Sequence, residues 1–119
     1  MRRSDFRDLQ IWQKSRVIVR DLYRITKTYP SDERFEIVSQ IRRAGISVMS
    51  NIAEGHGRSS NQDFCRFLFM SLGPVRELES LIEISQDLGF LEDGSELISN
   101  LQEEARMITA FIAHLKSQD

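Results

Sequence analysis

The sequence predicts an all-α protein, an antiparallel up-down-up-down four-helix bundle formed by a single domain over residues 1–119. Apolar residues recur at helical spacing in four long stretches. The connections at 29–31, 55–60 and 89–95 are short, and short loops between long helices make neighbouring helices antiparallel. The chain has only two prolines and no Asn-Gly turns between alternating runs, so the signals of a β-sheet are missing.

The first helix is expected over residues 8–28, with Asp8 as its N-cap. Its apolar residues cover about 200° of the helical wheel, so a second side of this helix is expected to pack against another surface. Pro30 ends the helix because the residue before a proline is pushed out of the helical conformation. Four basic residues gather at one edge of the apolar face: Arg16, Arg20, Arg24 and Lys27.

The second helix is expected to begin after Ser31 and to end at about Glu54, with Gly55 or Gly57 as the left-handed residue that ends it. A narrow polar stripe runs along this helix within an arc of about 80°. The stripe contains Gln40, Arg43, Ser47, Asn51 and Glu54. Such a stripe indicates a structural network, an interface or a site, and the pattern alone leaves the three interpretations open.

Two other arginines of this region have their own predicted contacts. Arg42 is flanked by Phe35 and Met49 on the wheel, which predicts an interface arginine with a packed stem and a paired head. Arg58 lies four residues after Glu54 and is placed to pair with it. The glycine-serine stretch at 55–60 also has the composition of an anion-binding helix N-terminus, but no strand precedes it, so a tight turn is favoured.

The third helix is expected to be capped by Ser59 or Ser60 and to end near Leu88, with Gly89 as its left-handed residue. Pro74 lies inside this run and predicts a kink near residues 70–74 rather than two separate helices.

An acidic row on the third helix is the natural partner of the arginine row, within the subunit or across an interface. Its residues are Glu79, Glu83 and Asp87. The fourth helix is expected to begin after residues 93–95, and the residues from 116 onward are expected to fray.

The sequence offers no catalytic or metal-binding constellation. The histidines His56 and His114 fall in different helices, and no Glu-x-x-His pair occurs, so the ligands of helical-bundle metal sites are missing. The single cysteine, Cys65, sits in an apolar run and is expected to be a small buried hydrophobe. We therefore expect no enzymatic activity, no metal, no cofactor and no small-molecule substrate.

Charge is divided unevenly along the chain. Residues 1–58 carry 12 Lys and Arg against 7 Asp and Glu, whereas residues 59–119 carry 4 against 11. The split is typical of a nucleic-acid surface or of oppositely charged helices that pair, and the overall charge of −2 favours pairing. The lack of a signal peptide, a disulfide framework and a membrane-length apolar run predicts a cytoplasmic protein with no membrane partner.

Four motifs together resemble one known family. They are Phe-Arg-Asp-Leu-x-Ile-Trp at 6–12, Gln-Ile-Arg-Arg-Ala at 40–44, Asn-Ile-Ala-Glu-Gly-x-Gly-Arg at 51–58 and Asp-Phe-x-Arg-Phe-Leu at 63–68. They resemble the bacterial four helix bundle protein family, whose members include proteins encoded by intervening sequences inside large-subunit ribosomal RNA genes. The resemblance spans nearly the whole chain.

The resemblance implies an antiparallel bundle that assembles as a homopentamer, without an established enzymatic activity for most members. Related proteins of diversity-generating retroelements bind nucleic acid and a reverse transcriptase through a basic surface of the pentamer. This chain departs from them in being acidic overall, and it has Gly45 and Pro74 where the family is expected to have Ala and Ser.

The leading hypothesis is therefore a non-enzymatic, homo-oligomeric scaffold or adaptor. In it, Gln40, Ser47 and Asn51 form a polar seam between helices, while Arg42 and Arg43 reach partners at or near a subunit boundary. The alternative is an accessory protein that binds RNA, or works with a nucleic-acid enzyme, through the basic row of the first helix.

Overall fold

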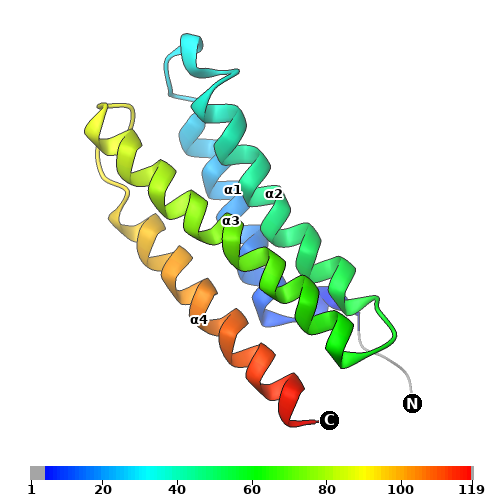
Figure 1. Cartoon of the computed structure of the whole chain (residues 1–119). Helices are drawn as coiled ribbons and strands as arrows, with labels where there is room; N and C mark the ends of the chain where they lie inside the picture. The colour runs from blue at the N-terminus through cyan, green and yellow to red at the C-terminus, as the bar shows by residue number, and fades with distance from the viewer. Residues whose placement is uncertain (1–4, 119) are drawn as a thin grey trace.

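The computed structural model of the chain describes residues 5–118, and it shows four long helices packed in one elongated bundle (Figure 1). The bundle measures 50 × 20 × 19 Å. The helices are α1 (Gln10–Thr26), α2 (Ile37–His56), α3 (Asn61–Asp87) and α4 (Ser95–Ser117), and short 3-10 turns, η1 (Phe6–Asp8) and η2 (Ser31–Glu33), precede α1 and α2. The predicted all-α four-helix bundle is confirmed.

The order of the helices around the bundle decides which side chains can meet. Helix α1 packs against α2 and α4, and α3 packs against the same two helices (Figure 1). Within residues 5–118, α1 and α3 lie across the diagonal and make no close backbone contact. The core between them is aliphatic, and its most completely buried side chains include Leu22, Ile41, Ile52, Leu68, Leu78, Ile82, Leu101 and Ile108.

The helices α2 and α3 approach closely because Gly55 has no side chain. A Cβ atom at this position would lie 2.8 Å from Phe67 Cβ and 2.9 Å from Phe64 Cδ1, well inside normal contact distance. Gly55 is thus the last residue but one of α2, and Gly57 follows the helix with φ −78°, a right-handed conformation. The prediction that Gly55 or Gly57 is left-handed is wrong, because close packing on α3 and not a chain reversal requires the glycine.

Two predicted helix starts are also wrong. Asp8 lies inside η1, whose cap is the Asp5 side chain, and α1 begins two residues later at Gln10 and ends at Thr26. Ser31 begins η2 rather than α2. The backbone of Glu36 (φ −113°, ψ −106°) lies outside the helical region and separates the two segments. Helix α2 therefore begins at residue 37, where the chain becomes buried again after Tyr29.

The ends of α3 agree with the sequence. The Asp63 backbone N–H donates to Ser60 Oγ at 3.1 Å, which selects Ser60 over Ser59 as the cap. Gly89 has φ +80°, and the N–H groups of Gly89 and Phe90 donate to the Gln86 and Ser85 carbonyls, which completes a Schellman motif.

Helix α3 continues through Pro74 as one helix and not two, as predicted, while the kink stays a prediction. Helix α4 begins at the expected position and extends to Ser117.

Candidate functional site

The polar stripe of α2 lies on the surface of the bundle. Gln40, Arg43 and Glu54 are exposed, and Ser47 and Asn51 are half-buried. The Asn51 side-chain amide donates to the Ser47 carbonyl oxygen at 2.9 Å and contacts Ser47 Oγ at 3.3 Å. Both bonds stay within α2, so this pair braces one helix rather than joining two helices of the chain. A role of the stripe at a subunit boundary stays a prediction.

Arg42 reaches from α2 to the C-terminal turn of α1. Its Nε donates to Thr26 Oγ1 at 3.0 Å, and Nη2 donates to the Tyr23 carbonyl at 3.4 Å. The guanidinium carbon lies 4.5 Å from the centroid of the Tyr23 ring. A positive charge is favourable here because the carbonyl end of a helix carries partial negative charge. The paired head that the sequence predicts is present, and its partners belong to the same chain.

The basic row of α1 is exposed along its whole length. Arg24 pairs with Asp21 at 3.0 Å, and the Arg16 guanidinium lies 5.6 Å from the centroid of Trp12. Within the part of the chain that the structure describes, no carboxylate lies in ion-pair distance of Arg16, Arg20 or Lys27. The row is therefore a solvent-facing basic strip on the outside of the bundle.

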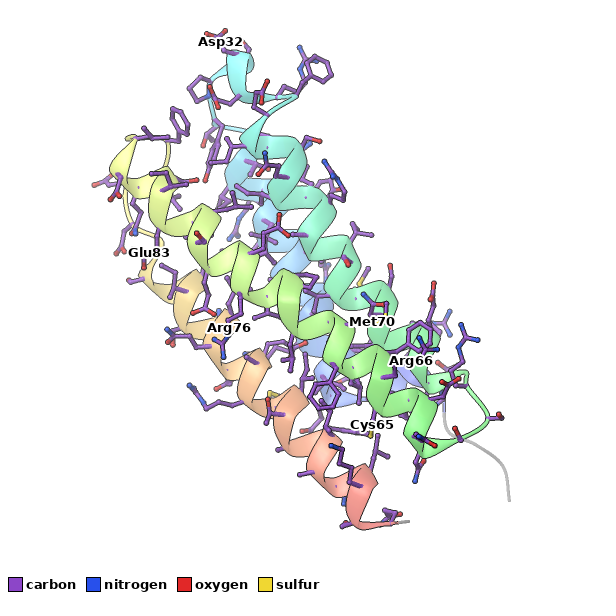
Figure 2. The ribbon with its side chains drawn as sticks, in the orientation of Figure 1. Asp32, Cys65, Arg66, Met70, Arg76 and Glu83 are labelled. Carbon is purple, nitrogen blue, oxygen red and sulfur yellow. The ribbon has the colours of Figure 1, made fainter. Side chains whose placement is uncertain are left out.

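The acidic row of α3 does not meet the basic row within the chain. Glu79 pairs with Arg76 of its own helix at 2.8 Å, and Arg76 and Glu83 lie on the side of α3 towards α4 (Figure 2). Because α1 and α3 are diagonal to each other, the predicted pairing within the subunit is wrong. Pairing across an interface stays a prediction.

The turn between α2 and α3 presents arginines over an aromatic ring. The guanidinium carbons of Arg58 and Arg66 lie 4.5 and 4.9 Å from the centroid of Phe67. Phe67 is buried, so both cations cover the outer surface of a core side chain. The predicted pairing of Arg58 with Glu54 stays a prediction.

An open hollow of about 910 Å³ lies near the N-terminal end of α3 and the C-terminal end of α4. Phe69 and Met70 contribute exposed apolar surface to it, and the Lys116 ammonium lies 5.1 Å from the Phe69 ring centroid. Cys65, Arg66 and Met70 all lie in this part of α3 (Figure 2). The Cys65 thiol itself is buried and donates to the Ile112 carbonyl at 3.9 Å, as expected of a small core residue.

A buried carboxyl in α4 is the feature that sequence reasoning missed. Glu104 is 0% exposed, and neither of its carboxyl oxygens has a hydrogen-bond partner among the described residues. Burial raises the pKa of this carboxyl from 4.5 to about 8, and the nearby positive charge of Lys14 offsets only part of that rise. Lys14 of α1 forms an ion pair with Glu103, the residue that precedes Glu104.

The spacing of α4 contains the signal for this residue. Leu97, Leu101, Glu104 and Ile108 follow one another at intervals of four, three and four, which is the inward-facing pattern of a bundle helix. A glutamate in that pattern predicts a buried acid.

The described residues offer no metal centre and no membrane span. Between residues 5 and 118, no three His, Cys, Asp or Glu side chains gather where they could hold a metal ion. None of the helices described combines the length and the apolar character that crossing a bilayer requires.

Residues 7–110 match the family model described as 23S rRNA-intervening sequence protein. The chain belongs to this family. The match covers most of the chain, and it confirms the resemblance that the motifs at 40–44 and 51–58 indicated. No curated protein sequence matches the chain.

The fold of this 23S rRNA-intervening sequence family chain is also similar to a solved structure. That structure is a protein of unknown function from the S23 ribosomal protein family of Bacteroides thetaiotaomicron VPI-5482. The two share 22% sequence identity with a TM-score of 0.78, and the similarity covers 86% of this chain and 97% of the other. At this identity the similarity shows a shared fold.

Proposed function

We propose that this member of the 23S rRNA-intervening sequence family is a non-enzymatic cytoplasmic scaffold that assembles with copies of itself. The pentamer implied by the family resemblance is the form proposed. The observation that carries the proposal is the apolar surface left on the outside of α3. Its exposed large apolar residues are Phe69, Met70, Ile84 and Leu88.

Helix α3 supports the proposal because its inward face is already complete. Phe64, Leu68, Val75, Leu78 and Ile82 fill the core side of this helix. The exposed residues form a second apolar set, with Leu88 56% exposed and Met70 49% exposed. Covering them would remove apolar area from water at about 25 cal/mol per Å². A second copy of the chain is the partner proposed.

The molar mass in solution tests the proposal. Light scattering during gel filtration should give about five times 13.8 kDa at micromolar concentration, on the pentamer expectation. A smaller multiple of 13.8 kDa would support self-association but contradict the pentamer. A mass of 13.8 kDa would overturn the proposal.

A matched pair of variants tests whether α3 forms the contact. Met70→Glu places a charge on the exposed side of α3, whereas Val17→Glu places one on α1 at a residue that is 51% exposed. If α3 forms the contact, the first variant should lower the measured mass and the second should leave it unchanged. Equal effects of the two charges would show that α3 is not the contact.

The exposed basic strip of α1 favours a second candidate function, binding of structured RNA. Arg16, Arg20 and Lys27 are exposed and have no acidic partner among residues 5–118, and copies of the strip would be repeated in a ring. Each phosphate neutralised adds roughly 0.7 to 0.9 to the slope of log affinity against log salt concentration.

Binding of a structured RNA at increasing salt concentration tests this second function. Replacing Arg16, Arg20 and Lys27 by glutamine should lower the salt slope by about two units or more. The control replaces exposed Arg106 of α4 by glutamine and should leave the slope unchanged. Absence of binding by the unmodified protein at low salt would rule the function out.

A further inference from the structure

Glu104 lies in surroundings that suit only the neutral form of its carboxyl group. The side chain is completely buried, and both oxygens lack a hydrogen-bond donor among residues 5–118. A carboxylate without a donor in an apolar interior carries a large desolvation penalty, whereas a protonated carboxyl is tolerated at a smaller cost. The core therefore holds a proton as part of its packing.

The charged groups that act on Glu104 come from α1 and from α4 itself. From α1, Lys14 is the nearby cation, and its side chain is 19% exposed. On α4 itself, Glu103 is the neighbouring acid, and Arg106 is exposed. On α3, Arg76 lines a surface hollow with Ala105 and Arg106, and its charge is paired with Glu79.

The seam between α1 and α4 is held at its centre by Lys14. Its ammonium pairs with Glu103 and contacts Asn100 Oδ1 at 3.5 Å. The seam is hollowed at both ends: a cavity of about 140 Å³ lies beside Asp21 and Leu97, and one of about 470 Å³ lies beside Leu9 and Met107. Lys14 therefore closes the seam directly outside the position of Glu104.

We propose that Glu104 is a proton-controlled switch in the seam between α1 and α4. When the Glu104 carboxyl is neutral, Lys14 stays paired with Glu103 and the seam between α1 and α4 is closed. When the proton leaves to water, the new carboxylate attracts Lys14 inward, away from Glu103, or admits water. Either response loosens the contact between α1 and α4 while the packing of α2 on α3 is left in place.

The direction of the pH effect follows from the two protonation states. In the unfolded chain the carboxyl loses its proton near the ordinary pKa of 4.5, while in the folded chain it keeps the proton until about pH 8. Between these values the folded state binds one more proton than the unfolded state, so raising the pH favours unfolding. The unfolding constant should rise by up to about tenfold per pH unit in this window and level off above it.

Urea unfolding between about pH 5 and 9 tests the switch in three variants and the unmodified protein. Glu104→Gln and Glu104→Leu should lack the tenfold rise of the unfolding constant per pH unit. Subtracting the pH profile of either variant from that of the unmodified protein removes the contribution of every other titrating group. The control Glu77→Gln should retain the rise, because Glu77 is exposed on α3 and takes no part in the pairing of Lys14. Identical pH profiles of the unmodified protein and Glu104→Leu would overturn the proposal.

Two local measurements separate a switch from a general loss of stability. The ¹³C signal of the Glu104 carboxyl should titrate near pH 8 in the folded protein, and a midpoint near 4.5 would overturn the proposal. At alkaline pH, hydrogen exchange in the unmodified protein should exceed that of Glu104→Leu in peptides of α1 and α4 only. An equal increase in all four helices would refute the seam as the place of opening.

Discussion

Replacing Gly55 with alanine should destabilise the bundle, although alanine is the better helix former. In an open helix interior this substitution stabilises by about 1 kcal/mol. Here the new methyl group would lie 2.8 Å from Phe67 Cβ, an atom attached directly to the backbone of α3. Relief requires α2 and α3 to separate, and overpacking of this kind costs about 1–3 kcal/mol, occasionally more. We expect a net loss of up to about 2 kcal/mol once the gain in helix propensity is subtracted.

Two other mid-helix glycines provide matched controls for this prediction. A methyl group at Gly45 would meet Leu22 Cδ1 at 2.9 Å, the end of a flexible side chain that can rotate away, so Gly45→Ala should be close to neutral. A methyl group at Gly73 meets nothing within 4 Å, so Gly73→Ala should stabilise by up to about 1 kcal/mol, reduced because Pro74 follows.

Urea unfolding followed by far-ultraviolet circular dichroism measures all three free energies of unfolding under the same conditions. The expected order of stability is Gly55→Ala lowest, then Gly45→Ala, then Gly73→Ala. If Gly55→Ala were as stable as Gly73→Ala, the close approach of α2 and α3 at this residue would be refuted.

Three further predictions concern the ends of the helices, and each is measured by urea unfolding. Arg42→Lys removes the Nε bond to α1 and the stacking of the guanidinium on an aromatic ring, and should cost about 1 kcal/mol. The same change at exposed Arg43 should cost little, and equal costs would contradict the bridging role. Ser60→Ala removes the cap of α3 and should cost about 1 kcal/mol, with Ser59→Ala as the neutral control. If Ser59→Ala lowered the free energy of unfolding more than Ser60→Ala, the assignment of Ser60 as the cap would be wrong. Gly89→Ala strains a residue at φ +80° and should cost about 1–2 kcal/mol, and no loss of stability would refute the strained turn.

Features set by short stretches of sequence were predictable. The left-handed Gly89, the start of α4 and a serine cap for α3 each depend on a few neighbouring residues, and each was predicted, with the structure selecting Ser60 from the two candidate caps. The family was also predictable, because the motif at 51–58 and the model match over 7–110 agree. The start of α2 was missed because buried contacts from residue 37 onward, and not the acidic turn at Ser31–Glu33, decide where that helix begins.

The candidate site was less predictable, because it depends on how each helix is rotated and which helices are neighbours. The sequence placed Arg42 beside apolar residues but did not identify its partners, which lie 16 to 19 positions earlier in the chain. It also left open whether the basic row of α1 pairs with the acidic row of α3 within the subunit, which the bundle prevents by placing these two helices on its diagonal.

The sequence by itself determined four amphipathic helices, their order and the two ends of α3, because helical periodicity and capping act over a few residues. Only the tertiary structure decided that Gly55 is a point of close contact and that Arg42 completes the end of α1. It alone showed that Glu104 is buried without a partner. These properties depend on distances between helices and on exclusion of water, and a pattern within one helix contains neither quantity.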